Sequence, residues 1–225
     1  MNTSRIKFTA SSIAWTEGGV MHMGIKASAG SDITIDWGDG RIITHFFQNE
    51  SEMVNFSHNY FPKLEMPPSH GILFHVEISG NHPDCRIIGF LLGGDMNAND
   101  LDLKNCTELE ELSLDVETEC SSFDLSQNTA LKLLSFHVVD ITSLDLTNNT
   151  ALEELYIDGT RLTHLSLTTN FALKYLYCIC SSIEKIFIYY APQLCCADFG
   201  EYSNIDDETR SRIQEIIEEN NIENE

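Results

Sequence analysis

Basic residues are scarce in this sequence. Its 225 residues include 13 lysines and arginines against 35 aspartates and glutamates, which gives a formal net charge of −22 at pH 7. So acidic a surface repels phosphate backbones and anionic membranes at long range, and we expect no nucleic-acid partner. Long apolar runs are also lacking: no stretch approaches the roughly 20 apolar residues that cross a bilayer, so we expect no membrane insertion. Residues 1–12 do not contain the apolar core of a signal peptide, which leaves open an intracellular protein and a secreted one that has lost its leader.

Signatures of catalysis and metal binding are missing too. The chain has no phosphate-binding P-loop, no G-x-S-x-G elbow, no H-E-x-x-H pair and no dinucleotide fingerprint. Its seven cysteines form no C-x-x-C pair, and its histidines have no metal-ligand spacing, so each histidine is expected in a loop or at the surface. Asp36 and Asp39 are not followed by the later glutamate of an EF-hand calcium loop. We therefore expect no catalytic residue, no cofactor and no metal site.

What the sequence does contain is a twelve-residue segment that occurs three times in similar form. FDLSQNTALKLL begins at Phe123, LDLTNNTALEEL at Leu144 and LSLTTNFALKYL at Leu165. Each unit alternates apolar residues as L-x-L and then repeats them as L-x-x-L-x-L, a spacing that predicts short strands joined by turns instead of a helical stripe. One such unit cannot bury its apolar residues alone, so the units are expected to stack as coils of a solenoid.

The repeat extends on both sides of these three units and fixes the roles of several polar positions. A further unit begins at Leu101 and a closing one at Ile186, while a degenerate opening coil is expected near Cys85. Cys120 and Cys178 fall on inward positions, where cysteine acts as a small apolar residue. Two polar columns recur at the turns: asparagines that we expect to bind backbone groups, and aspartates that we expect to cap solvated turns instead of binding a cation. These columns are Asn128, Asn149 and Asn170, and Asp102, Asp124 and Asp145.

The stretch LDLTNNTALEELYIDGTRLTHLSL resembles the 21-residue leucine-rich repeats of internalin-type bacterial surface proteins. The resemblance covers about residues 85–200. It implies a leucine-rich-repeat solenoid, and it implies secretion or display on a bacterial cell surface.

Residues 1–80 do not repeat but alternate apolar and polar residues between Gly, Pro, Asn and Asp clusters, as short strands do. Their motifs IDWGDG, from Ile35, and HNY, ending at Tyr60, resemble those of the polycystic-kidney-disease-type (PKD) immunoglobulin-like domain, which implies an immunoglobulin-like β-sandwich. In physical terms Trp37 fills a core, glycines 38 and 40 permit a tight turn, and Asp39 bonds the turn backbone.

The expected fold is therefore mostly β and has three parts. Residues 1–80 form the sandwich, residues 81–203 form five to six coils of the solenoid, and residues 204–225 form a C-terminal cap and tail. A helix is predicted from about Asp206 to Glu219, because acids open it and isoleucines recur at helical spacing; residues 221–225 are expected to fray.

The most promising surface lies on the repeated strands. In LEELYID, Leu155 and Ile157 point inward, so the residues between them point outward onto a sheet that we expect to be concave. Aromatic and charged side chains gather there, as they do on surfaces that bind proteins or sugar rings. Alternatively, the aromatic pairs only stabilise the sheet. The candidate ligand-binding residues are His137, Glu154, Tyr156, Asp158, Tyr175 and Tyr177.

These patterns favour a non-catalytic binding or adhesion module that recognises a protein or glycan on its concave face. We expect the protein to be a monomer. Two alternatives stay open. One is a carbohydrate-active enzyme or its accessory domain, which would need a cleft with two carboxylates about 5–10 Å apart. The other is a purely structural spacer.

Overall fold

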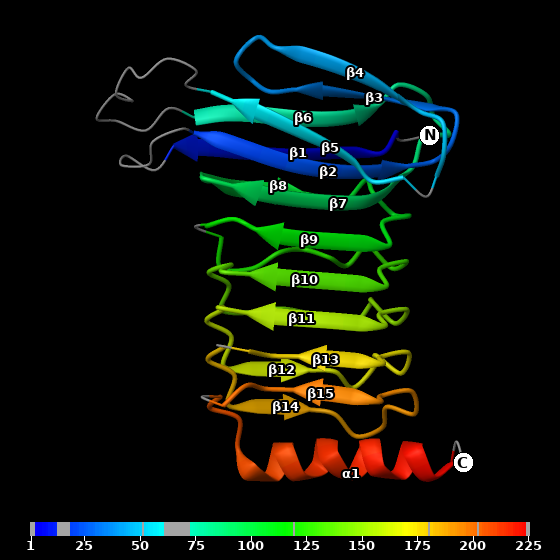
Figure 1. The fold of residues 1–225 in the computed structure, drawn as a ribbon, viewed down its shortest axis with the longest axis vertical. Helices are drawn as coiled ribbons and strands as arrows, with labels where there is room; N and C mark the ends of the chain where they lie inside the picture. The colour runs from blue at the N-terminus through cyan, green and yellow to red at the C-terminus, as the bar shows by residue number, and fades with distance from the viewer. Residues whose placement is uncertain are drawn as a thin grey trace.

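The computed structural model describes residues 3–12, 19–50, 52–60, 73–118, 120–179, 181–201 and 203–223. The described chain is mostly β, with one helix, α1 (Asp207–Glu223), at its C-terminal end (Figure 1). The strands are β1 Arg5–Ser12, β2 Val20–Ala27, β3 Ser31–Asp36, β4 Ile42–Phe47, β5 Val54–Asn59, β6 Leu73–Gly80, β7 Ile87–Gly94, β8 Met96–Asp102, β9 Glu111–Asp115, β10 Leu133–His137, β11 Glu154–Asp158, β12 His164–Ser166, β13 Tyr175–Tyr177, β14 Lys185–Phe187 and β15 Cys196–Asp198.

The N-terminal part consists of two antiparallel layers. One is a five-stranded sheet in the order β4-β3-β6-β1-β8, and the other is formed by β5, β2 and β7 at one end of an eight-stranded sheet. The rings of Phe8 on β1 and Phe90 on β7 lie 6.4 Å apart, and both side chains are buried between the layers. The alternation seen in the sequence matches this burial. On β3, Ile33 and Ile35 are 1% exposed, whereas the neighbouring Asp32 is exposed to solvent.

The W-G-D-G turn has the physical roles that its residues predict. Trp37 is 2% exposed, and Gly38 has a φ of 78°, a left-handed conformation that L side chains rarely adopt. A Cβ atom on Gly38 would lie 2.6 Å from the carbonyl oxygen of His75, so the space there excludes a side chain as well. The Asp39 carboxylate accepts a hydrogen bond from the Arg41 N–H at 3.0 Å. These contacts confirm the predicted core tryptophan and the predicted turn.

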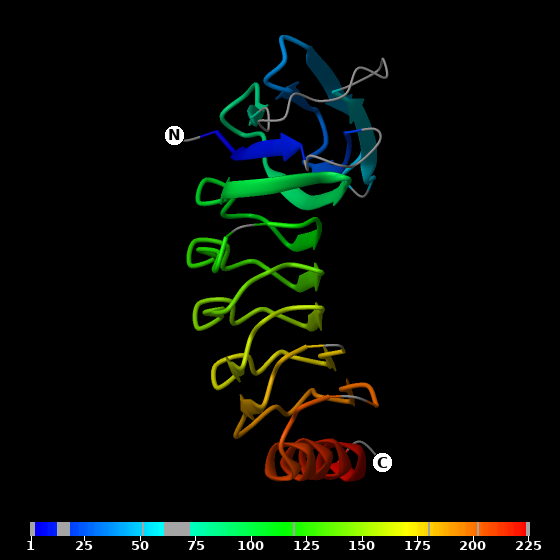
Figure 2. The ribbon, with the colours of Figure 1, turned by 90° about the vertical axis from the view of Figure 1, so that its left-hand side faces the viewer.

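From β7 onward the chain forms a β-solenoid of about five turns. Its main sheet is parallel, in the order β7-β9-β10-β11-β13-β15, so one strand of each coil lies beside that of the next. Figure 2 shows these strands along one side of the stack and the turns along the other. On the turn side β12 and β14 pair as a two-stranded sheet, while the L-x-L segments at residues 123–125 and 144–146 form no strand. The solenoid prediction is confirmed, with fewer strands on the turn side than the pattern indicated.

The asparagine column is a structural ladder. Asn128, Asn149 and Asn170 are at most 1% exposed. The side-chain N–H groups of Asn149 donate to the carbonyls of Leu125 at 3.1 Å and Asn128 at 2.9 Å, and the other two asparagines bond the preceding coil in the same way. Each amide therefore ties one coil to the coil before it.

The first coil is shared with the N-terminal layers. Strand β7 pairs antiparallel with β2 on one edge and parallel with β9 on the other, and β8 pairs antiparallel with β1. The register of Phe90 with Leu112 and of Leu92 with Leu114 confirms the degenerate opening coil. The two parts are consequently joined by a continuous sheet, and the N-terminal layers cover the first coil of the stack (Figure 1).

Helix α1 covers the other end of the stack (Figures 1 and 2). Asp206 caps it by accepting a hydrogen bond from the Thr209 N–H at 2.7 Å, and Ile213 and Ile216 are buried, as predicted. The helix nevertheless continues to Glu223, so the expectation of fraying is wrong for residues 221–223, while residues 224–225 lie outside the described chain. The physical reason is Asn220, whose amide donates to two carbonyls of the last coil at 2.8 Å each and so anchors the final turns.

Candidate ligand-binding face

The outward side chains of β9, β10, β11, β13 and β15 form a continuous surface that we call the sheet face. No other segment of the described chain crosses it in Figure 1, and the column of strands runs nearly straight in both views, whereas the sequence led us to expect a concave sheet. The residues of the sheet face are Glu111, Ser113, Asp115, Leu133, Ser135, His137, Glu154, Tyr156, Asp158, Tyr175, Tyr177, Cys196 and Asp198.

Strand register brings all six candidate residues together. Glu154 lies opposite Tyr175, and Tyr156 lies opposite Tyr177, on the neighbouring strands β11 and β13. His137 on β10 lies opposite Asp158. This placement follows from a repeat of constant length, because equivalent residues of successive coils then fall in line across a parallel sheet.

The centre of the sheet face is a stacked pair of tyrosines. The rings of Tyr156 and Tyr177 are 4.9 Å apart between centroids and only 2° from parallel. The Tyr156 hydroxyl donates to the Glu154 carboxylate at 2.9 Å, and the Tyr177 hydroxyl lies 3.6 Å from the Cys196 sulfur. Burial and the hydrogen bond to Glu154 raise the pKa of Tyr156, and the hydrogen bond to Cys196 raises the pKa of Tyr177 to about 12. Both hydroxyls therefore stay protonated at neutral pH.

Charges on the sheet face differ from those beside it. Immediately before the strands, acids and lysines alternate from coil to coil and form ion pairs: Glu110 with Lys132 at 2.9 Å and Glu153 with Lys174 at 2.6 Å. The outward strand positions hold acids without any lysine or arginine. His137 contributes a polar contact, since its Nδ1 lies 2.9 Å from an Asp158 oxygen. The face is thus aromatic and acidic.

One polar partner of the sheet face escaped the sequence reasoning. The Lys26 ammonium, on β2, reaches Glu111 on β9 at 2.7 Å. Eighty-five residues separate the two in the chain, so no local pattern could have indicated this pair. It forms because β7, which separates β2 from β9 in the sheet, has the side-chain-free Gly89 at the matching position.

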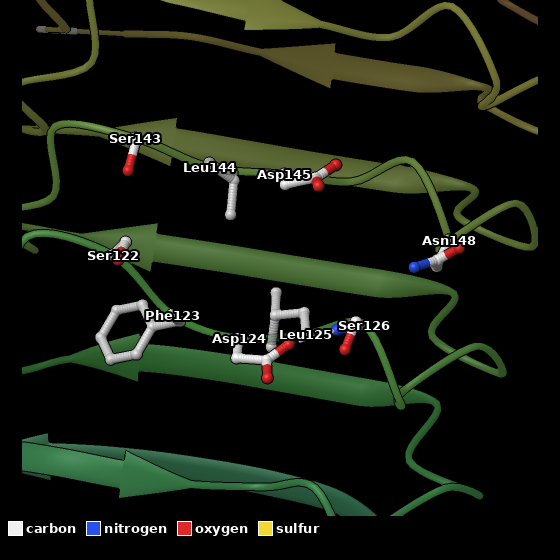
Figure 3. Close-up of a pocket in the computed structure, with 9 residues that line it drawn as sticks. All are labelled: Ser122, Phe123, Asp124, Leu125, Ser126, Ser143, Leu144, Asp145 and Asn148. Atoms are coloured by element: carbon white, nitrogen blue, oxygen red, sulfur yellow. Dashed lines mark hydrogen bonds between the residues drawn. The ribbon is translucent and has the colours of Figure 1, made fainter.

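The turn side of the solenoid carries a small pocket of about 330 Å³ between two coils (Figure 3). Asp124 and Asp145 both line it, which makes it the natural place to look for a pair of catalytic carboxylates. Each carboxylate instead accepts a hydrogen bond from the turn N–H two residues on, at 3.0 and 2.9 Å, as the capping hypothesis predicts. The hydrogen bonds from Ser126 and Thr147 lower the pKa of Asp124 and of Asp145, respectively. Neither residue is therefore suited to be the protonated acid that glycoside hydrolysis needs.

A buried histidine contacts an aspartate in the N-terminal layers. His58 is 5% exposed, stacks on Trp37 with ring centroids 4.5 Å apart, and places Nε2 2.9 Å from the Asp39 carboxylate. The expectation of a loop or surface position is wrong for this histidine, because it lies on β5 with its side chain turned inward against the core tryptophan. These contacts join the W-G-D-G turn to the core, so we assign His58 and Asp39 a structural role.

Among the described residues, no cluster of three or more histidine, cysteine or acidic side chains has the arrangement of a metal site. Within the same residues, no helix has the length and apolar character needed to cross a membrane. Comparisons with protein-family models, with curated proteins and with solved structures find no match for this chain.

Proposed function

We propose that this protein is a non-catalytic recognition module that binds a protein or a glycan on its sheet face. The observation that carries the proposal is the Tyr156–Tyr177 stack, set among acids on a sheet that no described segment covers. Paired tyrosines offer a large rigid surface with polar hydroxyls at its edge, and such residues are enriched where proteins bind ligands. The continuous sheet and the buried asparagine ladder hold the stack on a firm support.

The finer classification is part of the same proposal. The repeat motifs resemble internalin-type leucine-rich repeats, and the W-G-D-G and H-N-Y motifs resemble the PKD-type immunoglobulin-like domain. On that basis we assign the solenoid to leucine-rich repeats, the N-terminal layers to an immunoglobulin-like sandwich, and the protein to the surface or secretions of a bacterium. The two layers that pack on Trp37 and the parallel coils support this assignment.

The proposal is tested by removing the tyrosine stack. A Tyr156→Ala/Tyr177→Ala variant and the wild type are screened side by side against a glycan array and a panel of cell-surface proteins. The matched control is Tyr189→Ala/Tyr190→Ala, which removes two tyrosines that are 70% and 64% exposed elsewhere on the molecule. We expect ligands of the wild type to bind the control and to be lost from the stack variant.

The same variants separate recognition from mere stabilisation of the sheet. A cross-strand aromatic pair contributes about 0.5–1.5 kcal/mol beyond its buried area, so urea denaturation should show a modest loss of stability in the stack variant. If that loss is the only effect, and every ligand of the wild type still binds, the sheet face is not the binding site.

A further inference from the structure

Most acids of the sheet face form no ion pair with a lysine or arginine of the described chain. Five outward positions are acidic, and among the described residues only Glu111 lies within ion-pair distance of a lysine or arginine, Lys26. Glu154 attracts Lys174 from farther away, and Asp158 contacts His137 at 2.9 Å. The row just before the strands shows that the chain does pair acids with lysines between coils where its sequence provides them. The five acids are Glu111, Asp115, Glu154, Asp158 and Asp198.

These acids surround the tyrosine stack. Glu154 and Asp158 flank Tyr156 on its own strand, and Asp198 lies opposite Tyr177 in the strand register. A cationic group that contacts either ring is therefore also close to a carboxylate. Aromatic faces attract cations by about 0.5–1 kcal/mol at exposed sites, and an adjacent carboxylate adds to this attraction.

On the β10 side of the tyrosine stack, the neighbouring side chain is small. The register places Ser135 beside Tyr156, and Ser113 beside Ser135, so two successive strands carry short hydroxyl side chains next to the ring. A flat group can stack on the Tyr156 ring over these serines. A guanidinium is planar and weakly hydrated and stacks on aromatic rings, whereas an ammonium is compact and strongly hydrated.

We propose that the occupant of the sheet face is an extended segment of a partner protein that carries arginine side chains. This rests on the proposed function of the face and names the chemistry of its ligand. Charge complementarity selects the partner: the field of a chain with net charge −22 attracts cations and repels anionic ligands, but gives no attraction to a neutral sugar. The tyrosine stack then selects arginine over lysine.

The experiment measures binding of three labelled peptides by fluorescence anisotropy, at low and at high salt. The peptides alternate serine with arginine, with lysine or with glutamine. We expect the arginine peptide to bind the wild-type protein, to bind more tightly than the lysine peptide, and to weaken as salt rises. The glutamine peptide should not bind.

Two triple variants with the same change in net charge separate the sheet face from the charge of the whole chain. The face variant replaces three acids around the stack by their isosteric amides, and the control replaces three exposed acids elsewhere. We expect the face variant to bind the arginine peptide about tenfold more weakly than the control, as about three exposed ion pairs together would give. The variants are Glu154→Gln/Asp158→Asn/Asp198→Asn and Glu52→Gln/Glu108→Gln/Glu219→Gln.

The outcomes distinguish this inference from the proposed function. Equal weakening by the two triple variants, no binding of the arginine peptide, or equal binding of the arginine and lysine peptides overturns the arginine assignment. If a glycan or protein from the screens still requires Tyr156 and Tyr177 but is indifferent to the face triple variant, the proposed function stands without it. Should neither the peptides nor any screened ligand depend on the two tyrosines, both are refuted.

Discussion

Replacing Asn149 by alanine tests the asparagine ladder most directly. Its amide donates to the carbonyls of Leu125 and Asn128 in the preceding coil, and the side chain is completely buried. Both carbonyls also accept backbone N–H groups at 3.0 and 3.2 Å, so each would keep one hydrogen bond after the substitution. The loss is therefore two net hydrogen bonds, at about 0.5–1.5 kcal/mol each, and not two orphaned carbonyls.

We expect Asn149→Ala to lower the free energy of unfolding by about 1–3 kcal/mol, measured by urea denaturation followed by circular dichroism. The side-chain oxygen of Asn149 has no hydrogen-bond partner, so its removal offsets part of the loss and favours the lower half of this range. The matched control is Asn148→Ala at the exposed neighbouring position, which should stay within about 0.5 kcal/mol of the wild type.

A second substitution at the same position adds a pH signature. Asn149→Asp places a carboxylate against two carbonyl oxygens, and burial disfavours its charged form, so the pKa of the new group is raised in the folded state. Its stability is therefore least impaired below the unfolded pKa, about 3.9, and falls as pH rises toward neutrality. The reasoning is refuted if Asn149→Ala matches Asn148→Ala, or if Asn149→Asp is as stable as the wild type at pH 7.

Three further substitutions test the turn, the Asp39 carboxylate and the cap by urea denaturation. Gly38→Ala should be more destabilising than Gly40→Ala. Both positions have positive φ, which costs an alanine about 1–2 kcal/mol, but only at Gly38 would the new Cβ also lie 2.6 Å from a β6 carbonyl oxygen. Equal losses of stability would contradict this reasoning. Burial would raise the pKa of Asp39, but hydrogen bonds from the Arg41 N–H of the turn and from the buried His58 hold it below its ordinary value. The contribution of Asp39 to stability is therefore present above about pH 4 and is lost as pH falls. Asp39→Asn should reduce the loss of stability in acid. An unchanged dependence of stability on pH would count against the Asp39–His58 interaction. Ile213 is 1% exposed, so Ile213→Ala should lower the free energy of unfolding by about 2–5 kcal/mol. Ile222 is 76% exposed, so Ile222→Ala should lower it by less than about 0.5 kcal/mol. Similar values for the two variants would show that α1 does not pack on the last coil.

The sheet face was predictable because the repeat is regular. Alternation along a strand tells inward from outward residues, as it did for Leu155 and Tyr156, and a constant interval tells which outward residues become neighbours. The stack of Tyr156 on Tyr177 follows from these two facts once the strands are known to be parallel. The sequence could not show that Tyr156 bonds Glu154 or that its other side faces open serines, because these depend on rotamers and on the side chains of the adjacent coils.

The ends of the solenoid were less predictable. The ladder position is occupied by Cys106 in the coil that leads into β9 and by Ala191 in the last coil, so the amide ladder stops at both ends. The Cys106 thiol donates to the Arg5 carbonyl of β1, and Asn220 of α1 donates to the Ala191 carbonyl. Both bonds join segments far apart in the chain, and neither belongs to the repeat.

By itself, then, the sequence determined the coil length, the inward and outward residues, the asparagine ladder and a helix at the C-terminal end. These properties are local, because each depends on spacings within one or two units of the repeat. Only the tertiary structure decided that β7 serves both parts of the molecule and that Lys26 reaches Glu111. The physical reason is that pairing between distant strands is selected by the packing of the whole chain, and no periodicity in the sequence records which edges will meet.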